Sequence, residues 1–222
     1  MNAPDIALTS EELTTLEHEV ENLIGFVNES MSNRSDISEL IGMSSTEMMQ
    51  DNHRNSARFI LTSVSIGDFR KLKDTMPWVY ATYHNHGFSY QYFAIVFETW
   101  IQAVHKFIDP PLSEKYAAIY EWLSEHHKDW IELSQHYTSE NIQPPKEWSR
   151  IQDQFLNALL AADTSTCLEL ANTHIQTHTD VQHFYLDVIQ PSLYEIGIYG
   201  IIMRSVYPRS IWRHPLSLAS CR

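Results

Sequence analysis

Hydrophobic positions recur at steps of three and four residues along most of the chain, a pattern typical of amphipathic helices. The strongest example lies in residues 76–108, MPWVYATYHNHGFSYQYFAIVFETWIQAVHKFI. Its second half places one apolar face along about five helical turns. That face consists of Phe93, Val96, Phe97, Trp100, Ile101, Val104, Phe107 and Ile108. Gly87 favours a helix end and Ser89 a helix start, so we expect a sharp corner that carries His84 and His86.

Similar patterns predict an all-α fold for the whole chain. In the first 140 residues, helices are expected to begin near residues 9–10, 37, 44–45, 68, 89 and 113. The helix near residue 68 should be interrupted near Pro77, because proline is tolerated in a first turn but disfavoured in a helix interior. The helix from Ser113 is expected to continue unbroken to about Tyr137.

A polar stretch with two prolines, Thr138 to Lys146, has no apolar period and is the expected domain boundary. Beyond it, apolar positions predict three short helices over residues 147–199. Asp163 is expected to cap the second of these, which runs to about His178, and Asp180 the third.

The charge balance limits the classes of partner. The chain has 28 acidic and 15 basic residues, a net charge of −13, which opposes nucleic acid and anionic lipid. Two cysteines suit a reducing compartment, and neither a signal sequence nor 18 consecutive apolar residues occur. We therefore expect a cytoplasmic protein with no nucleic-acid or membrane partner.

Twelve histidines invite a test for metal or catalytic sites. Their spacing offers no convergent metal-ligand set, so no metal is expected. His127 is expected to be the main core histidine, since it falls on the buried stripe between Leu123 and Trp130. His53 lies in DNHRNS, which imitates a cobalamin histidine loop but sits in a helix pattern. An enzyme using Glu125, His126 or Asp129 stays an alternative, although neighbours on a helix point about 100° apart.

Residues 9–137 resemble the non-haem globin domain of the photoglobin family, which is similar to the sensor domains of stressosome proteins. The resemblance rests on ELIGMSSTEMMQDNHRNSARF, MPWVYATYHNHGFSYQYF and YEWLSEHHKDWI. It implies a globin-like sensor domain over residues 1–140 that lacks haem. The short corner around Gly87 and Phe88 agrees, because it leaves little room for the helix that carries a proximal histidine in haem globins.

Residues 151–199 resemble the opening helices of the four-helix module that caps the corrinoid in cobalamin-binding proteins. The matching signature is Pro191, Leu193, Glu195, Ile196 and Gly197. The resemblance implies a partial helical bundle over residues 147–199. In the family, a Trp and an I-S-x-x-x-E-H motif follow, and then a cobalamin-binding α/β domain.

The last 23 residues contain four arginines and no acidic residue, and they lack the family's continuation. Back-translated and read one nucleotide earlier, permitted codons restore the Trp, the Ile-Ser and the Glu-His. We therefore interpret residues 200–222 as an out-of-frame tail and expect the α/β domain to be a missing partner. On this view no cofactor binds this chain alone, and cobalamin or another tetrapyrrole belongs to the full-length parent.

The leading hypothesis is a sensory or regulatory protein of bacterial signal transduction, not an enzyme, and by family analogy a possible photosensor. It is expected to form a homodimer through helices and to act on an unknown signalling partner. Candidate residues for lining a ligand pocket are Trp78, Tyr83, His86, Phe97, Trp100 and His127. The alternatives are a haem-binding oxygen or redox sensor with His84 or His86 as axial ligand, and a ligand-free dimerisation module.

Overall fold

The computed structural model describes residues 4, 6–67, 69–137 and 144–199. The chain divides into two compact units, residues 1–137 and 138–222. This division falls at the polar stretch where the sequence analysis placed the domain boundary. Every regular element in the described ranges is a helix, which confirms the all-α prediction. Residues 200–222, interpreted above as an out-of-frame tail, lie outside the described residues.

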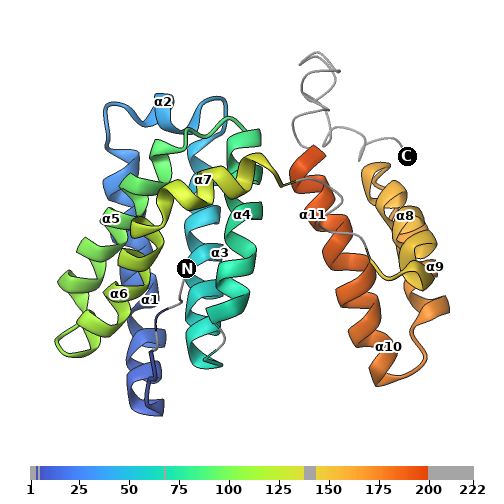
Figure 1. The fold of residues 1–222 in the computed structure, drawn as a ribbon, viewed down its shortest axis with the longest axis horizontal. Helices are drawn as coiled ribbons and strands as arrows, with labels where there is room; N and C mark the ends of the chain where they lie inside the picture. The colour runs from blue at the N-terminus through green and yellow to red at the C-terminus, as the bar shows by residue number, and fades with distance from the viewer. Residues whose placement is uncertain (1–3, 5, 68, 138–143, 200–222) are drawn as a thin grey trace, which may run out of the picture. The chain divides into compact units, whose positions relative to one another are not determined.

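The first unit contains seven helices among its described residues (Figure 1). They are α1 (Ser10–Ser32), α2 (Ile37–Ile41), α3 (Thr46–Ser65), α4 (Phe69–Asn85), α5 (Gln91–Phe107), α6 (Leu112–Glu125) and α7 (His127–Gln135). α5 packs against both α1 and α6, while α4 packs against α7. The predicted aromatic face of α5 is therefore largely buried at the centre of the unit, with Phe93, Val96 and Trp100 all under 5% exposed.

Local caps define where the long helices begin. Thr9 accepts a hydrogen bond from the Glu12 amide, and the Glu12 carboxylate accepts one from the Thr9 amide. This reciprocal pair satisfies two amides that a helix start leaves unpaired. Ser45 caps α3 with a single bond, since its hydroxyl accepts from the amide of Met48. Both helix starts were predicted from the sequence.

The predicted interruption near Pro77 is wrong, because α4 runs continuously through that residue. Leu72, Met76 and Tyr80 are buried one turn apart on both sides of the proline. A proline within a helix costs about 3 kcal/mol, and burial of three large side chains offsets that cost.

The unbroken helix predicted from Ser113 to Tyr137 is also wrong. The chain breaks at His126 into α6 and α7. The Trp130 indole nitrogen donates to the Leu123 carbonyl at 3.1 Å. In an unbroken helix that carbonyl would accept the amide of His127, so the indole takes the place of a backbone donor and the helix bends.

The corner between α4 and α5 has the sharp geometry predicted from Gly87, whose φ is +95°. Ser89 lies just before the helix, and its hydroxyl accepts from the amide of Gln91. The corner is joined to α2 by backbone contacts, since the Ser89 amide donates to the Leu40 carbonyl at 2.8 Å. A Cβ on Gly42 would lie 2.3 Å from the Gly87 carbonyl oxygen, so only glycine fits this approach.

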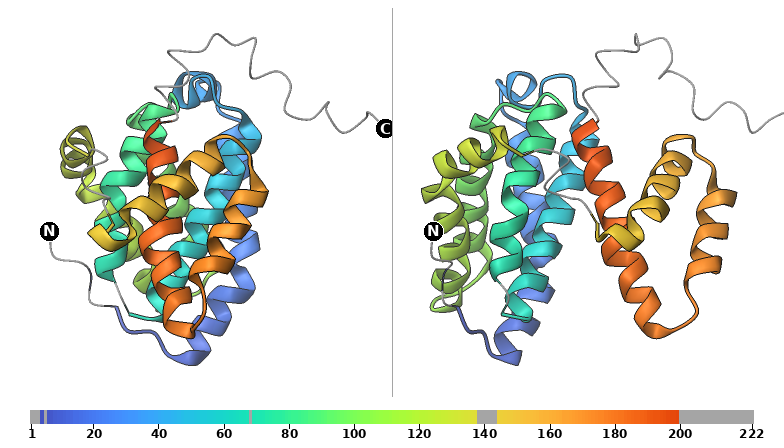
Figure 2. Two further views of the ribbon diagram at one scale, coloured as in Figure 1. Left: turned by 90° about the vertical axis from the view of Figure 1, so that its right-hand side faces the viewer. Right: turned by 45° about the vertical axis from the view of Figure 1, so that its right-hand side comes forward.

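The described residues of the second unit form α8 (Lys146–Leu160), α9 (Thr164–His174), α10 (His178–His183), a π-helical segment (Phe184–Ile189) and α11 (Gln190–Tyr199). The last three follow one another as a single rod, against which α8 packs (Figure 2). Ile151, Phe155, Phe184 and Val188 form a small buried core.

Two helix limits in this unit differ from the predicted ones. Asp163 caps α9 as expected, but α9 ends at His174 because a new capping box begins at Thr177. Asp180 is the third residue of that box and not the cap itself. The π-helical segment lies just before Pro191, which has no amide hydrogen to donate to the Asp187 carbonyl. The Gln190 amide donates to the carbonyl of Tyr185, five residues earlier, which is the hydrogen bond that defines a π-helix.

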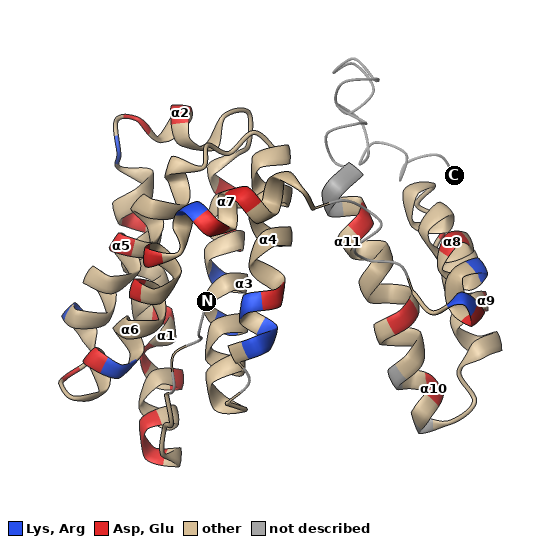
Figure 3. Ribbon diagram, in the orientation of Figure 1, with Lys and Arg blue, Asp and Glu red and all other residues tan. Residues whose placement is uncertain are grey.

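Acidic side chains occur on helices of both units, and basic ones gather at the start of α4 (Figure 3). None of the described helices is both long and apolar enough to cross a membrane.

Candidate functional site

A cavity of about 60 Å³ lies inside the first unit, between α3, α4, α5 and α6. Its wall is mostly apolar and contains no Asp, Glu, Lys or Arg. The lining residues are His53, Ser56, Phe59, Ile60, Leu72, Met76, Val79, Tyr83, Tyr92, Phe93, Val96, Phe97, Trp100, Tyr120 and Leu123.

The cavity has an exposed side and a buried side. Phe59 is 38% exposed, and Ser56, Val79 and Tyr83 are half-buried, so the residues nearest the solvent come from α3 and α4. At the buried side, the rings of Trp100 and Tyr120 stack with centroids 5.5 Å apart and planes 6° apart. A ligand would therefore enter between α3 and α4 and reach aromatic rings of α5 and α6.

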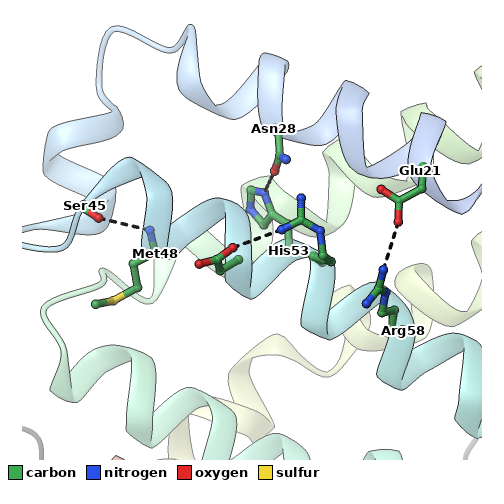
Figure 4. A network of polar contacts seen from close by, with 8 residues as sticks. Glu21, Asn28, Ser45, Met48, His53 and Arg58 are labelled. Carbon is green, nitrogen blue, oxygen red and sulfur yellow. Dashed lines mark hydrogen bonds and ion pairs between the residues drawn. The ribbon is translucent and has the colours of Figure 1, made fainter.

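His53 is the buried polar centre of the cavity wall, at 3% exposure. Its Nδ1 lies 2.7 Å from Asn28 Oδ1 (Figure 4), and its Nε2 lies 2.7 Å from the Tyr92 hydroxyl. Because an amide oxygen can only accept, Nδ1 carries the proton and Tyr92 donates to Nε2. Burial lowers the pKa of His53 to about 4, so the ring is neutral at pH 7. Both ring nitrogens are thereby occupied.

The tyrosines of the wall are held as neutral phenols. Burial raises the pKa of Tyr83 to about 12, and the Ser56 hydroxyl offsets part of that rise. Burial raises the pKa of Tyr92 and Tyr120 well above the ordinary value of 10. The Tyr120 hydroxyl is fully buried and interacts with the Tyr116 hydroxyl, which adds to the rise in its pKa. The cavity is thus an uncharged, aromatic space.

Three of the six residues expected to line a pocket lie in the cavity wall, namely Tyr83, Phe97 and Trp100. Trp78, His86 and His127 are not among its lining residues. His86 bonds the Thr82 carbonyl through Nδ1 at 2.7 Å, at the surface of the corner.

The expectation that His127 is the main core histidine is wrong. His127 is half-buried and contacts the Tyr80 hydroxyl at 2.8 Å, whereas His53 is the fully buried histidine of the described residues. His53 was missed because it was considered only as part of DNHRNS, which imitates a cobalamin histidine loop. Its spacing was the available signal, since Met49, His53, Ala57, Ile60 and Val64 form one regular buried stripe.

The geometry fits haem poorly. Residues 86–90, between α4 and α5, contain no helix that could carry a proximal ligand. The His84 ring stacks on Tyr90 at 4.2 Å, and neither His84 nor His86 reaches the cavity. A cavity of about 60 Å³ is also far below the 300–1,000 Å³ that pockets for larger ligands have.

The second unit exposes an apolar row on its rod. Val181, Tyr185 and Leu193 are each about half exposed, and with half-buried Ile189 they recur at four-residue spacing. Leu186 adds a further exposed apolar side chain beside Tyr185. An exposed apolar surface of this kind is typical of a site that binds a broad, flat, largely apolar ligand or partner.

Comparison with curated proteins and with solved structures finds no match. Comparison with protein-family models finds one match, confined to the second unit. Residues 151–198, which include most of α8, the π-helical segment and nearly all of α11, match the family of the B12 binding domain.

Proposed function

We propose that the protein is a sensory or regulatory protein and not an enzyme. Its first unit is a non-haem globin-like receiver, and its second unit is the helical part of a cobalamin-binding module. The observation that carries the proposal is the match of residues 151–198 to the B12 binding domain.

The first unit supports a receiving role through its cavity. The lining offers no pair of acid and base groups, because His53 has both nitrogens engaged and no carboxylate is present. Glu125 and Asp129 are exposed and lie outside the lining. The wall can therefore hold a small molecule without transforming it, which suits detection better than catalysis.

The arrangement favours the non-haem reading over the haem-binding alternative. The corner after α4 lacks a ligand-bearing helix, and the cavity is small. A Soret band in protein purified from its own cells would reverse this preference.

The second unit supports a role beside a corrinoid. Val181, Tyr185, Leu186 and Leu193 would cover one face of the macrocycle, while Ile151, Phe155, Phe184 and Val188 hold the helices in place. When bound, the corrinoid supplies a light-absorbing cobalt centre. The lower face would come from a partner α/β domain, and apolar surface left open favours homodimerisation.

Equilibrium dialysis of the full chain against hydroxocobalamin tests this assignment. We expect weak, saturable binding that does not survive gel filtration, because one helical face cannot enclose the ligand. Tyr185→Asp should raise the Kd about fivefold, since about 1 kcal/mol of apolar contact is lost. Ile66→Asp, at an exposed apolar residue of the first unit, is the matched control and should bind as the unaltered chain does.

Two results would contradict the proposal. The absence of saturable binding would remove the corrinoid role. Stoichiometric corrin absorbance that co-elutes with the protein would show that the chain holds the cofactor unaided. Sedimentation over a range of concentrations tests the dimer, which requires a mass that rises with concentration.

A further inference from the structure

The cavity of the first unit offers a ligand apolar contact on several sides. Its volume is about 60 Å³, and its lining contains no Asp, Glu, Lys or Arg. Atoms that line such a space lack some of the close neighbours that a packed core provides, so they forgo dispersion contacts. A small apolar molecule that enters the cavity would restore those contacts. An ionic ligand would instead lose its hydration without compensation.

The hydroxyl and imidazole groups of the wall do not stand ready for a polar ligand, because each interacts with another side chain. The interacting pairs are Tyr92 with His53, His53 with Asn28, Ser56 with Tyr83, and Tyr120 with Tyr116. A hydrogen-bonding atom of a ligand would have to break one of these pairs or stay unpaired in the cavity. Either outcome costs free energy, so the wall selects against such an atom.

Volume and access narrow the ligand further. Water occupies about 30 Å³ in the liquid, and a cavity of 150 Å³ holds benzene. A cavity of about 60 Å³ thus suits a molecule of about two to four non-hydrogen atoms. Phe59, which is 38% exposed, and half-buried Val79 belong to the lining, so a molecule of this size reaches the cavity between α3 and α4.

We propose that this cavity is a binding site for a small neutral molecule that has no hydrogen-bonding atom, of the class of short hydrocarbons. The ligand lies against Val96, Phe97 and the ring of Trp100 on α5, and against apolar side chains of α3, α4 and α6. The site rests on the proposed receiving role of the first unit, for which it names the class of ligand, and it does not depend on the corrinoid.

The test compares propane with dimethyl ether. Both molecules have three non-hydrogen atoms, and they differ only at the central one, which is a methylene carbon in propane and an oxygen in the ether. Each is titrated into the full chain, and the methyl resonances of the lining Ile, Leu and Val residues are followed by NMR. We expect the Kd of the ether to be about tenfold higher, because its oxygen loses its hydration without gaining a donor.

Two variants at one wall position locate the site. Val96→Leu reduces the space and should raise the Kd of propane about tenfold. Val104→Leu is the matched control, because Val104 is buried on the same helix but lies outside the lining, and it should change this Kd less than about twofold. Val96→Ala enlarges the space and should raise the affinity for butane relative to propane about fourfold, since one more methylene is accommodated.

Three results would overturn the proposal. They are a failure of propane to shift the wall resonances, an ether that binds as tightly as propane, and equal loss of propane affinity in Val96→Leu and Val104→Leu. The relative affinity for butane in Val96→Ala is a gain that misfolding cannot imitate, so its absence also counts against the site. Each of these failures leaves the hydroxocobalamin dialysis intact and is therefore distinguishable from failure of the proposed function.

Discussion

The buried His53 should make the first unit less stable in mild acid. In the folded chain its pKa is about 4, against an ordinary value of 6.5. Between these values the unfolded chain binds a proton that the folded chain does not, so the free energy of unfolding falls as the pH decreases. The loss begins near pH 6.5 and is complete near pH 4.

The magnitude follows from the two pKa values. The full difference corresponds to about 3 kcal/mol, and the part lost between pH 7 and pH 5 is about 2 kcal/mol. The hydrogen-bond partners of His53 do not change these energies over this pH range, because Asn28 is uncharged and Tyr92 stays a neutral phenol. His53→Gln should therefore lower stability at pH 7 but remove this part of its pH dependence.

Urea unfolding at pH 7, 6 and 5, followed by tryptophan fluorescence, measures the effect. Four of the six tryptophans lie in the first unit, so the signal reports mainly on it. His105→Gln, at an exposed histidine, is the control and should keep the original pH dependence. If the free energy of unfolding falls equally with pH in His53→Gln and in the unaltered chain, the reasoning is refuted, because the stability lost in acid would then come from another group.

Two further predictions concern backbone geometry and helix bonding. Gly42→Ala should destabilise the first unit by about 3 kcal/mol in urea unfolding, because its φ is +60° and the new Cβ would lie 2.3 Å from the Gly87 carbonyl oxygen. Gly25→Ala meets open space within α1 and should instead stabilise by about 0.5–1 kcal/mol, so equal effects of the two changes would contradict the argument. Ser192→Ala should cost about 1 kcal/mol in denaturation followed by circular dichroism, because it removes a buried 2.7 Å hydrogen bond to the Val188 carbonyl beside the π-helical segment. An unchanged transition would show that this hydroxyl does not stabilise the segment.

Features with short-range causes could be predicted from the sequence. The Thr9 cap, the apolar stripe of α5 and the left-handed Gly87 each depend on residues within one or two turns. The break at His126 could not be predicted in this way, because it depends on a side chain from the next helix taking the carbonyl of Leu123. The continuity of α4 through Pro77 likewise depends on burial against other helices.

The candidate site could be predicted only in part for a similar reason. Tyr83, Phe97 and Trp100 were found because aromatic residues at helical spacing mark a buried face. His53 gains its importance from groups far away in the chain, namely Asn28 and Tyr92. Such contacts are not visible in a local pattern.

The backbone contacts between α2 and the corner after α4 restrain the helices around the cavity. Ser44, just before α3, donates to the His86 carbonyl at 3.0 Å, which ties the start of α3 to the end of α4. At the opposite end, three residues join α3 to α4. The two helices are thus joined at both ends, and we expect them to bow in the middle more readily than they swing apart. We expect passage into the interior to depend on rotation of the Phe59 ring, so that exchange rates fall steeply as molecular width increases.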